Sequence, residues 1–83
     1  MTLQQLEYIV ALDKHKHFVT AAEHCFVTQP TLTIQVKKLE EEIGVVLFDR
    51  KKHPLQTTTA GAAIISKAKT ILREVTEMKH LVG

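Results

Sequence analysis

The segment from Thr28 to Gly44 constrains the fold most, because it is bounded as a helix at both ends and carries one apolar side. Apolar residues recur along it at intervals of four, three and four, namely Leu32, Val36, Leu39 and Ile43. This spacing places them on one face of an α-helix. The Thr28 hydroxyl can cap the first turn, Pro30 loses no intrahelical bond there, and Gly44 suits the C-terminal end. The segment therefore predicts an amphipathic helix that must bury one face against other elements.

Two shorter helices are predicted before it. Thr2, with Gln5 three residues later, forms a capping box ahead of a first helix over about 3–14. Apolar spacing over 18–25 indicates a second helix, and its pair of alanines suits close approach to a neighbour. Only Phe-Val-Thr connects the second helix to the third. Two helices joined by so short a turn form a helix-turn-helix candidate.

A small hairpin is predicted after Gly44. The run Val-Val-Leu-Phe-Asp-Arg is β-branched and aromatic, a charged turn of Lys-Lys-His-Pro follows, and Leu-Gln-Thr-Thr forms a short return. The whole pattern indicates a mainly α fold: a winged helix-turn-helix of three helices and a β-hairpin over residues 1–58, followed by a long helix over 59–83.

The long C-terminal helix, expected from Thr58 to Gly83, carries apolar residues at heptad spacing. Leu72 and Ile65 widen this stripe, so part of the helix should pack on its own domain. The rest is available to a second copy of the chain. We therefore expect a homodimer through this helix, with the following dimerisation residues: Ile64, Ala68, Ile71, Leu72, Val75, Met78 and Val82.

Composition limits the cellular setting. A length of 83 residues with 45% hydrophobic content suits one small domain with a marginal core. The single cysteine rules out an internal disulfide framework. The N-terminus lacks a basic segment ahead of an apolar core, and no apolar run approaches the roughly 18 residues of a membrane span. We expect a cytoplasmic protein without membrane contact.

Charge is segregated along the third helix rather than spread over the chain, whose net charge is only +2. Gln29, Thr31 and Thr33 come first, two lysines follow, and three glutamates, residues 40–42, close the helix. A recognition helix places its N-terminal residues on base edges in the major groove of DNA. The pattern predicts that the helix of residues 29–42 enters the groove with its three glutamates pointing away from the DNA. Taken one at a time, Gln, Thr and Lys are also common on solvated helix faces.

The hairpin tip adds positive charge beside this helix. Arg50, Lys51, Lys52 and His53 could reach phosphates or a minor groove. Alone, such a run is more often a solvated turn. It gains weight because it directly follows the candidate recognition helix. Thr28 has a second candidate role as well, since its hydroxyl could donate to a phosphate at the N-terminus of that helix.

Several motifs are shared with one known family. Leu-Gln-Gln-Leu-Glu-Tyr, an Ala-Ala pair, Thr-Gln-Pro opening the third helix, Leu-Phe-Asp-Arg and Thr-Thr-Ala-Gly occur in its order and spacing. Over residues 1–61 the chain resembles the N-terminal DNA-binding domain of LysR-type transcriptional regulators. The resemblance implies binding of double-stranded DNA, transcription regulation, and a linker helix that pairs in a dimer; a higher oligomer of the full-length protein stays open. It also implies an effector domain, which we expect outside this chain.

When the family's base-reading positions are matched to this sequence, they correspond to Gln29, Pro30, Thr33 and Ile34. The residues expected to flank it are Thr28, Thr31, Gln35, Lys37 and Lys38, with Arg50 anchoring the wing. Ile34 stands where the family commonly has Arg. An apolar side chain in the major groove can contact a thymine methyl, so we expect Ile34 to bias the half-site toward thymine.

Two further positions depart from the family pattern. Val19 replaces the polar residue that usually starts the second helix, although Thr20 with Glu23 offers a capping box one residue later. Cys25 stands where Leu is common, and we expect it to act as a small buried hydrophobe rather than a redox sensor.

Other functional classes fit less well. An enzyme needs a nucleophile with a base, or paired carboxylates across a cleft, and this chain offers neither. His15, His17 and His24 have no Cys or carboxylate at a familiar metal-ligand spacing, so we expect no metal and no cofactor. A winged helix that binds protein stays open, but such a surface would more often carry aromatic anchors than polar residues beside a basic wing.

Overall fold

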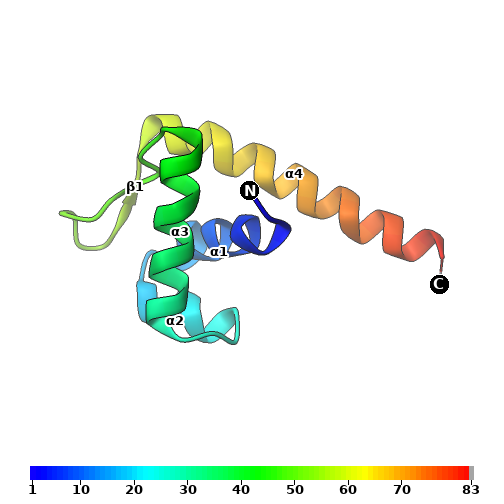
Figure 1. Ribbon diagram of the computed structural model, residues 1–83, viewed down its shortest axis with the longest axis horizontal. Helices are drawn as coiled ribbons and strands as arrows, with labels where there is room; N and C mark the ends of the chain where they lie inside the picture. The colour runs from blue at the N-terminus through cyan, green and yellow to red at the C-terminus, as the bar shows by residue number, and fades with distance from the viewer. Residues whose placement is uncertain (83) are drawn as a thin grey trace.

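The computed structural model of the protein describes residues 1–82 and comprises four helices and one two-stranded antiparallel sheet. In chain order the elements are α1 (Leu3–His15), α2 (Phe18–His24), α3 (Gln29–Ile43), β1 (Phe48–Asp49), β2 (Gln56–Thr57) and α4 (Thr59–Leu81). The first three helices form the body, the wing projects on one side, and α4 extends on the other (Figure 1). The expected winged helix-turn-helix followed by a long helix is therefore confirmed. Gly83, the last residue of the expected C-terminal helix, lies outside the described residues.

The core forms where the apolar faces of the helices meet. Leu32, Val36 and Leu39 of α3 are fully buried, as the spacing predicted. They join Ile9 and Leu12 of α1 in one hydrophobic cluster. The buried alanine pair of α2, residues 21–22, adds little volume to this cluster, which lets α2 pack between α1 and α3. The core thus fixes α3 with its opposite face toward solvent.

The helix ends follow the predicted caps with one exception. Thr2 and Gln5 form the capping box of α1, and the Thr28 hydroxyl accepts from the Thr31 amide at the start of α3. The expectation that Thr20 caps α2 is wrong, because the Nδ1 atom of His17 accepts from the Thr20 amide instead. Two residues separate α1 from α2: Lys16 in the left-handed conformation, φ 56°, and His17 in an extended conformation.

The wing has shorter strands than the sequence pattern indicated. Only Phe48–Asp49 and Gln56–Thr57 pair. The Leu47 and Phe48 amides donate to the Glu40 carboxylate, and the Leu47 carbonyl accepts from the Thr58 amide at 2.9 Å. Backbone groups that could have extended the ladder are therefore taken by α3 and by the start of α4.

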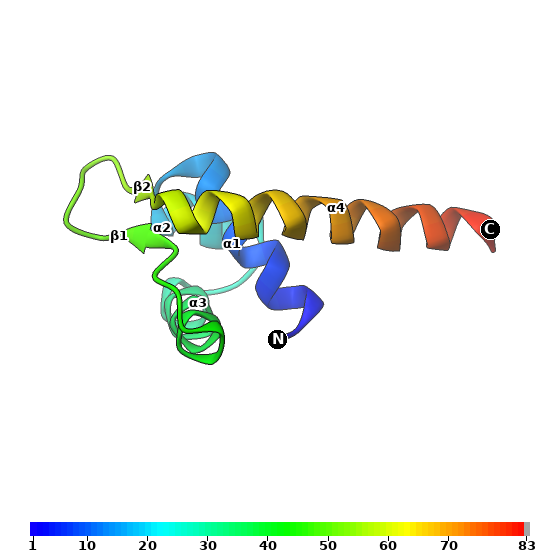
Figure 2. The ribbon, with the colours of Figure 1, turned by 90° about the horizontal axis from the view of Figure 1, so that it is seen from above.

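Helix α4 has two distinct halves. Its N-terminal half packs on α1 and buries Ile65 and Ala68, which confirms that part of this helix belongs to the core. Seen from above, α4 passes over α1 and continues beyond the body (Figure 2). Met78, Leu81 and Val82 are exposed in or just beyond that projecting part. Within residues 1–82, no helix is both long and apolar enough to cross a membrane.

Candidate nucleic-acid interface

The outward face of α3 carries most of the residues predicted to read DNA. The core stripe holds the opposite face inward, so these side chains point to solvent. Ile34 lies on this face with 53% of its surface exposed, and Thr33 is half-buried beside it. The other predicted DNA-contacting residues that are exposed on this helix are Gln29, Pro30, Thr31, Lys37 and Lys38.

The N-terminus of α3 is fully organised by local hydrogen bonds. The Thr28 hydroxyl donates to the Thr31 hydroxyl at 2.9 Å and accepts from the Thr31 amide at 3.3 Å. The cap role of Thr28 is therefore confirmed. Pro30 has no amide hydrogen, and the Leu32 amide donates to the Thr28 carbonyl at 3.1 Å. The positive end of the helix dipole still makes this end of α3 favourable for an anion.

The Gln35 side chain points toward α1 rather than to solvent. Its Oε1 atom accepts from Gln5 Nε2 of α1 at 3.1 Å, and the residue is only partly exposed. Gln5 is itself tied to the α1 capping box. The Gln35 side chain thus links α3 to α1, at the edge of the exposed face of α3.

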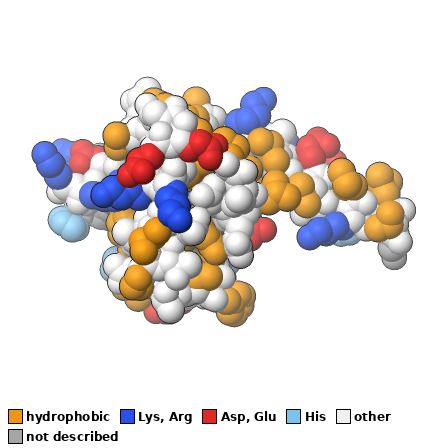
Figure 3. Space-filling view, in the orientation of Figure 1, with side chains coloured by type: hydrophobic (Ala, Val, Ile, Leu, Met, Phe, Trp, Pro, Cys, Tyr) orange, Lys and Arg blue, Asp and Glu red, His pale blue; other side chains and the backbone are white. Residues whose placement is uncertain are grey.

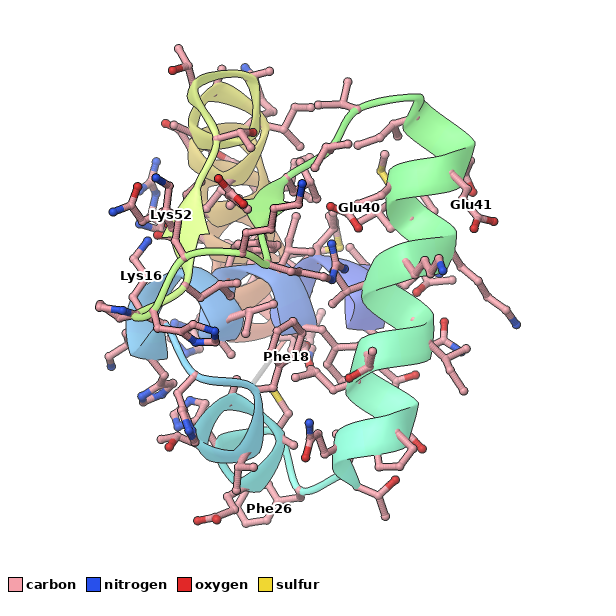
Figure 4. The ribbon with its side chains drawn as sticks, turned by 90° about the vertical axis from the view of Figure 1, so that its left-hand side faces the viewer. Lys16, Phe18, Phe26, Glu40, Glu41 and Lys52 are labelled. Carbon is pink, nitrogen blue, oxygen red and sulfur yellow. The ribbon has the colours of Figure 1, made fainter. Side chains whose placement is uncertain are left out.

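Glu40 connects the end of α3 to the wing. Its carboxylate accepts from the Leu47 amide at 2.7 Å and from Arg50 Nη2 at 2.8 Å, and only 8% of the residue is exposed. The expectation that the acidic run points away is therefore wrong for Glu40, although Glu41 and Glu42 are exposed. Figure 4 shows Glu40 turned toward the wing and Glu41 turned away from it.

Arg50 is held where the wing begins. Its guanidinium pairs with Glu40 and lies 5.8 Å from the centre of the Phe18 ring, so it bridges α3, the wing and α2. A guanidinium in this position is partly neutralised before any phosphate approaches. The wing cations beyond it, Lys51 and Lys52, are exposed together with His53.

Positive side chains lie close together over the wing and the neighbouring part of α3. Figure 3 shows Lys and Arg over the wing and the adjoining part of α3, whereas the projecting part of α4 carries hydrophobic groups together with charged groups of both signs. A groove runs between α3 and the wing and is lined by Thr33, Lys37, Glu41, Val46 and Arg50, among others. This groove joins the exposed face of α3 to the wing, so the polar side chains of both lie beside the exposed apolar residues Ile34 and Val46.

A second network holds the base of the wing to the helices. The Asp13 carboxylate of α1 accepts from the Thr57 hydroxyl of β2 and from Lys16 Nζ at 2.9 Å, and Lys69 of α4 lies 3.7 Å away. Partial burial tends to raise the pKa of Asp13, but the hydrogen bonds from Thr57 and Lys16 and the two lysine charges hold it below the usual value. The ionised carboxylate ties three elements together, which fixes the wing relative to α4.

Cys25 lies away from this surface. It is half-buried against the core, and desolvation, with a smaller contribution from Glu7, raises the pKa of its thiol. A thiol of this kind is less reactive than an exposed one. The position therefore agrees with the expected packing role.

The predicted dimerisation residues, apart from Leu72, follow one side of α4. Ile64, Ile71 and Val75 are half-buried, and Ala68 is buried in the core. Met78 is 65% and Val82 88% exposed. Leu72 faces elsewhere, toward a depression that it lines with Val10, Cys25 and Phe26. Exposed apolar side chains thus increase along α4 as it leaves the body.

Comparison with known proteins identifies the family. Residues 3–62 match the family model described as bacterial regulatory helix-turn-helix protein, lysR family. The chain belongs to the lysR family. It is 46% identical over 81 residues to the DNA-binding transcriptional dual regulator OxyR of Escherichia coli K12, and 42% identical over 80 residues to the regulator CfxR of Cupriavidus necator. The match to OxyR includes 98% of this chain but only 27% of OxyR. The chain thus spans about a quarter of that relative's length.

Solved structures agree with this assignment. A complex of the BenM DNA-binding domain with catB site 1 DNA superposes with a TM-score of 0.95 at 34% identity, covering 99% of this chain and 88% of that one. Full-length OxyR from Pseudomonas aeruginosa gives a TM-score of 0.94 at 44% identity, covering 99% of this chain and 28% of that one.

Sequence reasoning missed two residues that organise this lysR-family site. Glu40 was grouped with the solvated glutamates, yet it follows Leu39 and lies four residues after Val36, so it borders the buried stripe. That position was the available signal. His17 was not assigned as a cap, because Ser, Thr, Asp and Asn are the usual N-cap residues.

Proposed function

We propose that this chain is the DNA-binding portion of a LysR-type transcriptional regulator, and that α3 reads base edges in the major groove of double-stranded DNA. One observation carries the proposal: the exposed face of α3 presents polar and cationic side chains beside a basic wing, while a buried stripe holds that face outward. A helix in this setting can enter a major groove with its N-terminal residues on the bases.

The site residues divide by expected role. Gln29, Thr33 and Ile34 discriminate between bases, with Pro30 beside them. Sequence-independent affinity comes from cations that displace counterions from phosphates. This second group comprises Lys37, Lys38, Lys51, Lys52 and His53. Thr28, Thr31 and Gln35 position the N-terminal half of α3, and Arg50 positions the wing through Glu40.

Two copies of the chain bind together in this proposal. The exposed apolar residues of α4 pair between chains, and residues 59–83 then act as a dimerisation helix for a DNA-binding unit of residues 1–58. Pairing would set two copies of α3 for successive major-groove faces, about 34–36 Å apart or a multiple of that. The target would be an interrupted inverted repeat. The relatives are transcriptional regulators, which supports a regulatory rather than a catalytic role.

Gln29 and Lys51 should respond differently to alanine substitution. Gln29→Ala is expected to cost about 1–3 kcal/mol on specific DNA and to relax selectivity, because a base contact is lost. Lys51→Ala should weaken all sequences and lower the salt slope by about one. Titrations of specific and random duplexes at several salt concentrations measure both effects. Equal losses on the two duplexes for Gln29→Ala would contradict its assignment as a base reader.

Ile34 should be sensitive to a single methyl group on the DNA. Its side chain cannot hydrogen-bond a base edge, and the thymine methyl is the apolar group that the major groove offers. Replacing thymine by deoxyuridine in the half-site is expected to weaken wild-type binding several-fold and to leave Ile34→Ala unaffected. Ile34→Arg should shift preference toward guanine and raise the salt slope. If wild-type affinity is the same on both duplexes, Ile34 does not read thymine.

A further inference from the structure

A second groove lies on the other side of the wing. It is bordered by the C-terminal end of α1, the start of α2 and the wing itself. Gln29, the first residue of α3, and Lys52 of the wing both line it, so it adjoins the proposed DNA surface. Figure 4 shows Lys16 and Lys52 at one edge of the face that carries α3.

The lining of this groove is entirely cationic or neutral. No Asp or Glu contributes to it; its polar and charged members are His15, Lys16, His17, Gln29, Arg50, Lys52 and His53. Two of these cations are already engaged. Lys16 Nζ bonds Asp13 and Thr57, and Arg50 pairs with Glu40. The unengaged nitrogen atoms therefore belong mainly to Lys52 and the three histidines.

The hydrogen bonds of the histidines specify what they can offer. The Nδ1 atom of His17 accepts from the Thr20 amide, so a neutral His17 carries its proton on Nε2 and presents that N–H as a donor. Within residues 1–82, the Nε2 atom of His15 is buried and has no hydrogen-bond partner. His53 is exposed on the wing. Histidine is also the side chain that gains charge between about pH 8 and 5.

We propose that the exposed side chains of this groove, His17, Lys52 and His53, bind a phosphodiester of the DNA strand beside the major groove, and that the two histidines couple affinity to pH. The inference rests on the proposed function and extends it. An anionic phosphate stabilises a protonated histidine, so binding takes up protons and strengthens as pH falls. His17 contributes a donor even when neutral.

Neighbouring charges favour this direction. The groups around the groove are Asp13 and Lys16 of α1, His24 of α2, Asp49, Arg50, Lys51 and Lys52 of the wing, and Lys69 of α4. Asp13 is compensated by Lys16 and Lys69, while the Asp49 carboxylate accepts from the Lys51 amide. The His15 ring lies against the His24 ring, with centroids 5.0 Å apart. No uncompensated carboxylate lines the groove to compete with a phosphate.

The test compares DNA affinity at pH 8 and pH 6 for matched histidine variants. His17→Asn removes the imidazole but keeps a strong N-cap, which protects α2 from unfolding. It is combined with His53→Gln. The control is His80→Gln, an exposed histidine in the last turn of α4. If circular dichroism shows that the double variant misfolds, the single variant His53→Gln on the exposed wing is compared with the wild-type chain instead.

The wild-type chain and His80→Gln are expected to bind about three- to tenfold more tightly at pH 6 than at pH 8. The double variant should lose most of this gain. A duplex with neutral methylphosphonates flanking each half-site should also abolish it. An unchanged pH response in the double variant, or a wild-type affinity independent of pH, would overturn the inference while leaving DNA binding intact. Absence of binding to any duplex at both pH values would contradict the proposed function and this inference with it.

Discussion

Glu40→Ala is expected to lower the free energy of unfolding by about 1–3 kcal/mol, because it leaves a buried backbone amide without its acceptor. The carboxylate accepts from two backbone amides and from the Arg50 guanidinium. Without it, the amide of the buried Leu47 loses its acceptor, whereas the Arg50 guanidinium, 37% exposed, is left to water. A domain of this size is stable by only about 4–12 kcal/mol, so the loss would be severe. Urea unfolding followed by circular dichroism measures it.

A matched pair of controls separates this effect from helix propensity. Glu41→Ala changes the adjacent, exposed glutamate and should stay within about 0.5 kcal/mol of wild type. Glu40→Gln keeps one acceptor oxygen and should lie between the two. Equal stability of Glu40→Ala and Glu41→Ala would show that the link between α3 and the wing contributes nothing to folding.

Gly61→Ala is expected to destabilise the fold by about 2–3 kcal/mol, although alanine favours helix by about 1 kcal/mol over glycine. A Cβ atom at this position would lie 2.5 Å from the Leu47 carbonyl oxygen and 2.9 Å from the Leu47 Cα atom. Both are backbone atoms. They are fixed by the Thr58 amide bond to Leu47 and by the Thr58 hydroxyl bond to the Val46 carbonyl. Thermal or urea unfolding measures the loss.

Gly44→Ala provides the comparison for this prediction. No atom lies within 4 Å of a Cβ placed there, but the residue adopts φ 68°. Its cost should be only the left-handed strain of about 1–2 kcal/mol. A Gly61→Ala variant at least as stable as wild type would mean that α4 can shift away from the wing without loss.

The Thr28–Gly44 segment was predictable because its constraints are local. Helical spacing identified the buried stripe, and Thr28 and Gly44 marked both ends. Ile34, which is not part of that stripe, is exposed in the structure. Helix caps and helical periodicity depend on residues only a few positions apart, so a single sequence is enough to predict them.

Contacts between distant segments were not predictable in the same way. The run of three glutamates does not indicate that Glu40 contacts Arg50, because that contact depends on how far the wing folds back on α3. The strands were expected longer for the same reason: the backbone groups of Leu47 bond Glu40 and Thr58 rather than a ladder partner. His17 caps α2 because the turn after α1 leaves it in an extended conformation, which its own residue type does not indicate.

The most direct test of the account is fluorescence anisotropy of this chain with a labelled interrupted palindrome rich in A·T pairs and with a random duplex, each over a range of salt. We expect tighter binding to the palindrome, with two chains per duplex and log affinity falling linearly with log salt. Salt-independent signals, or no binding to either duplex, would contradict DNA recognition by α3 and the wing. The exposed side of α4 would then be the surface to test for a protein partner.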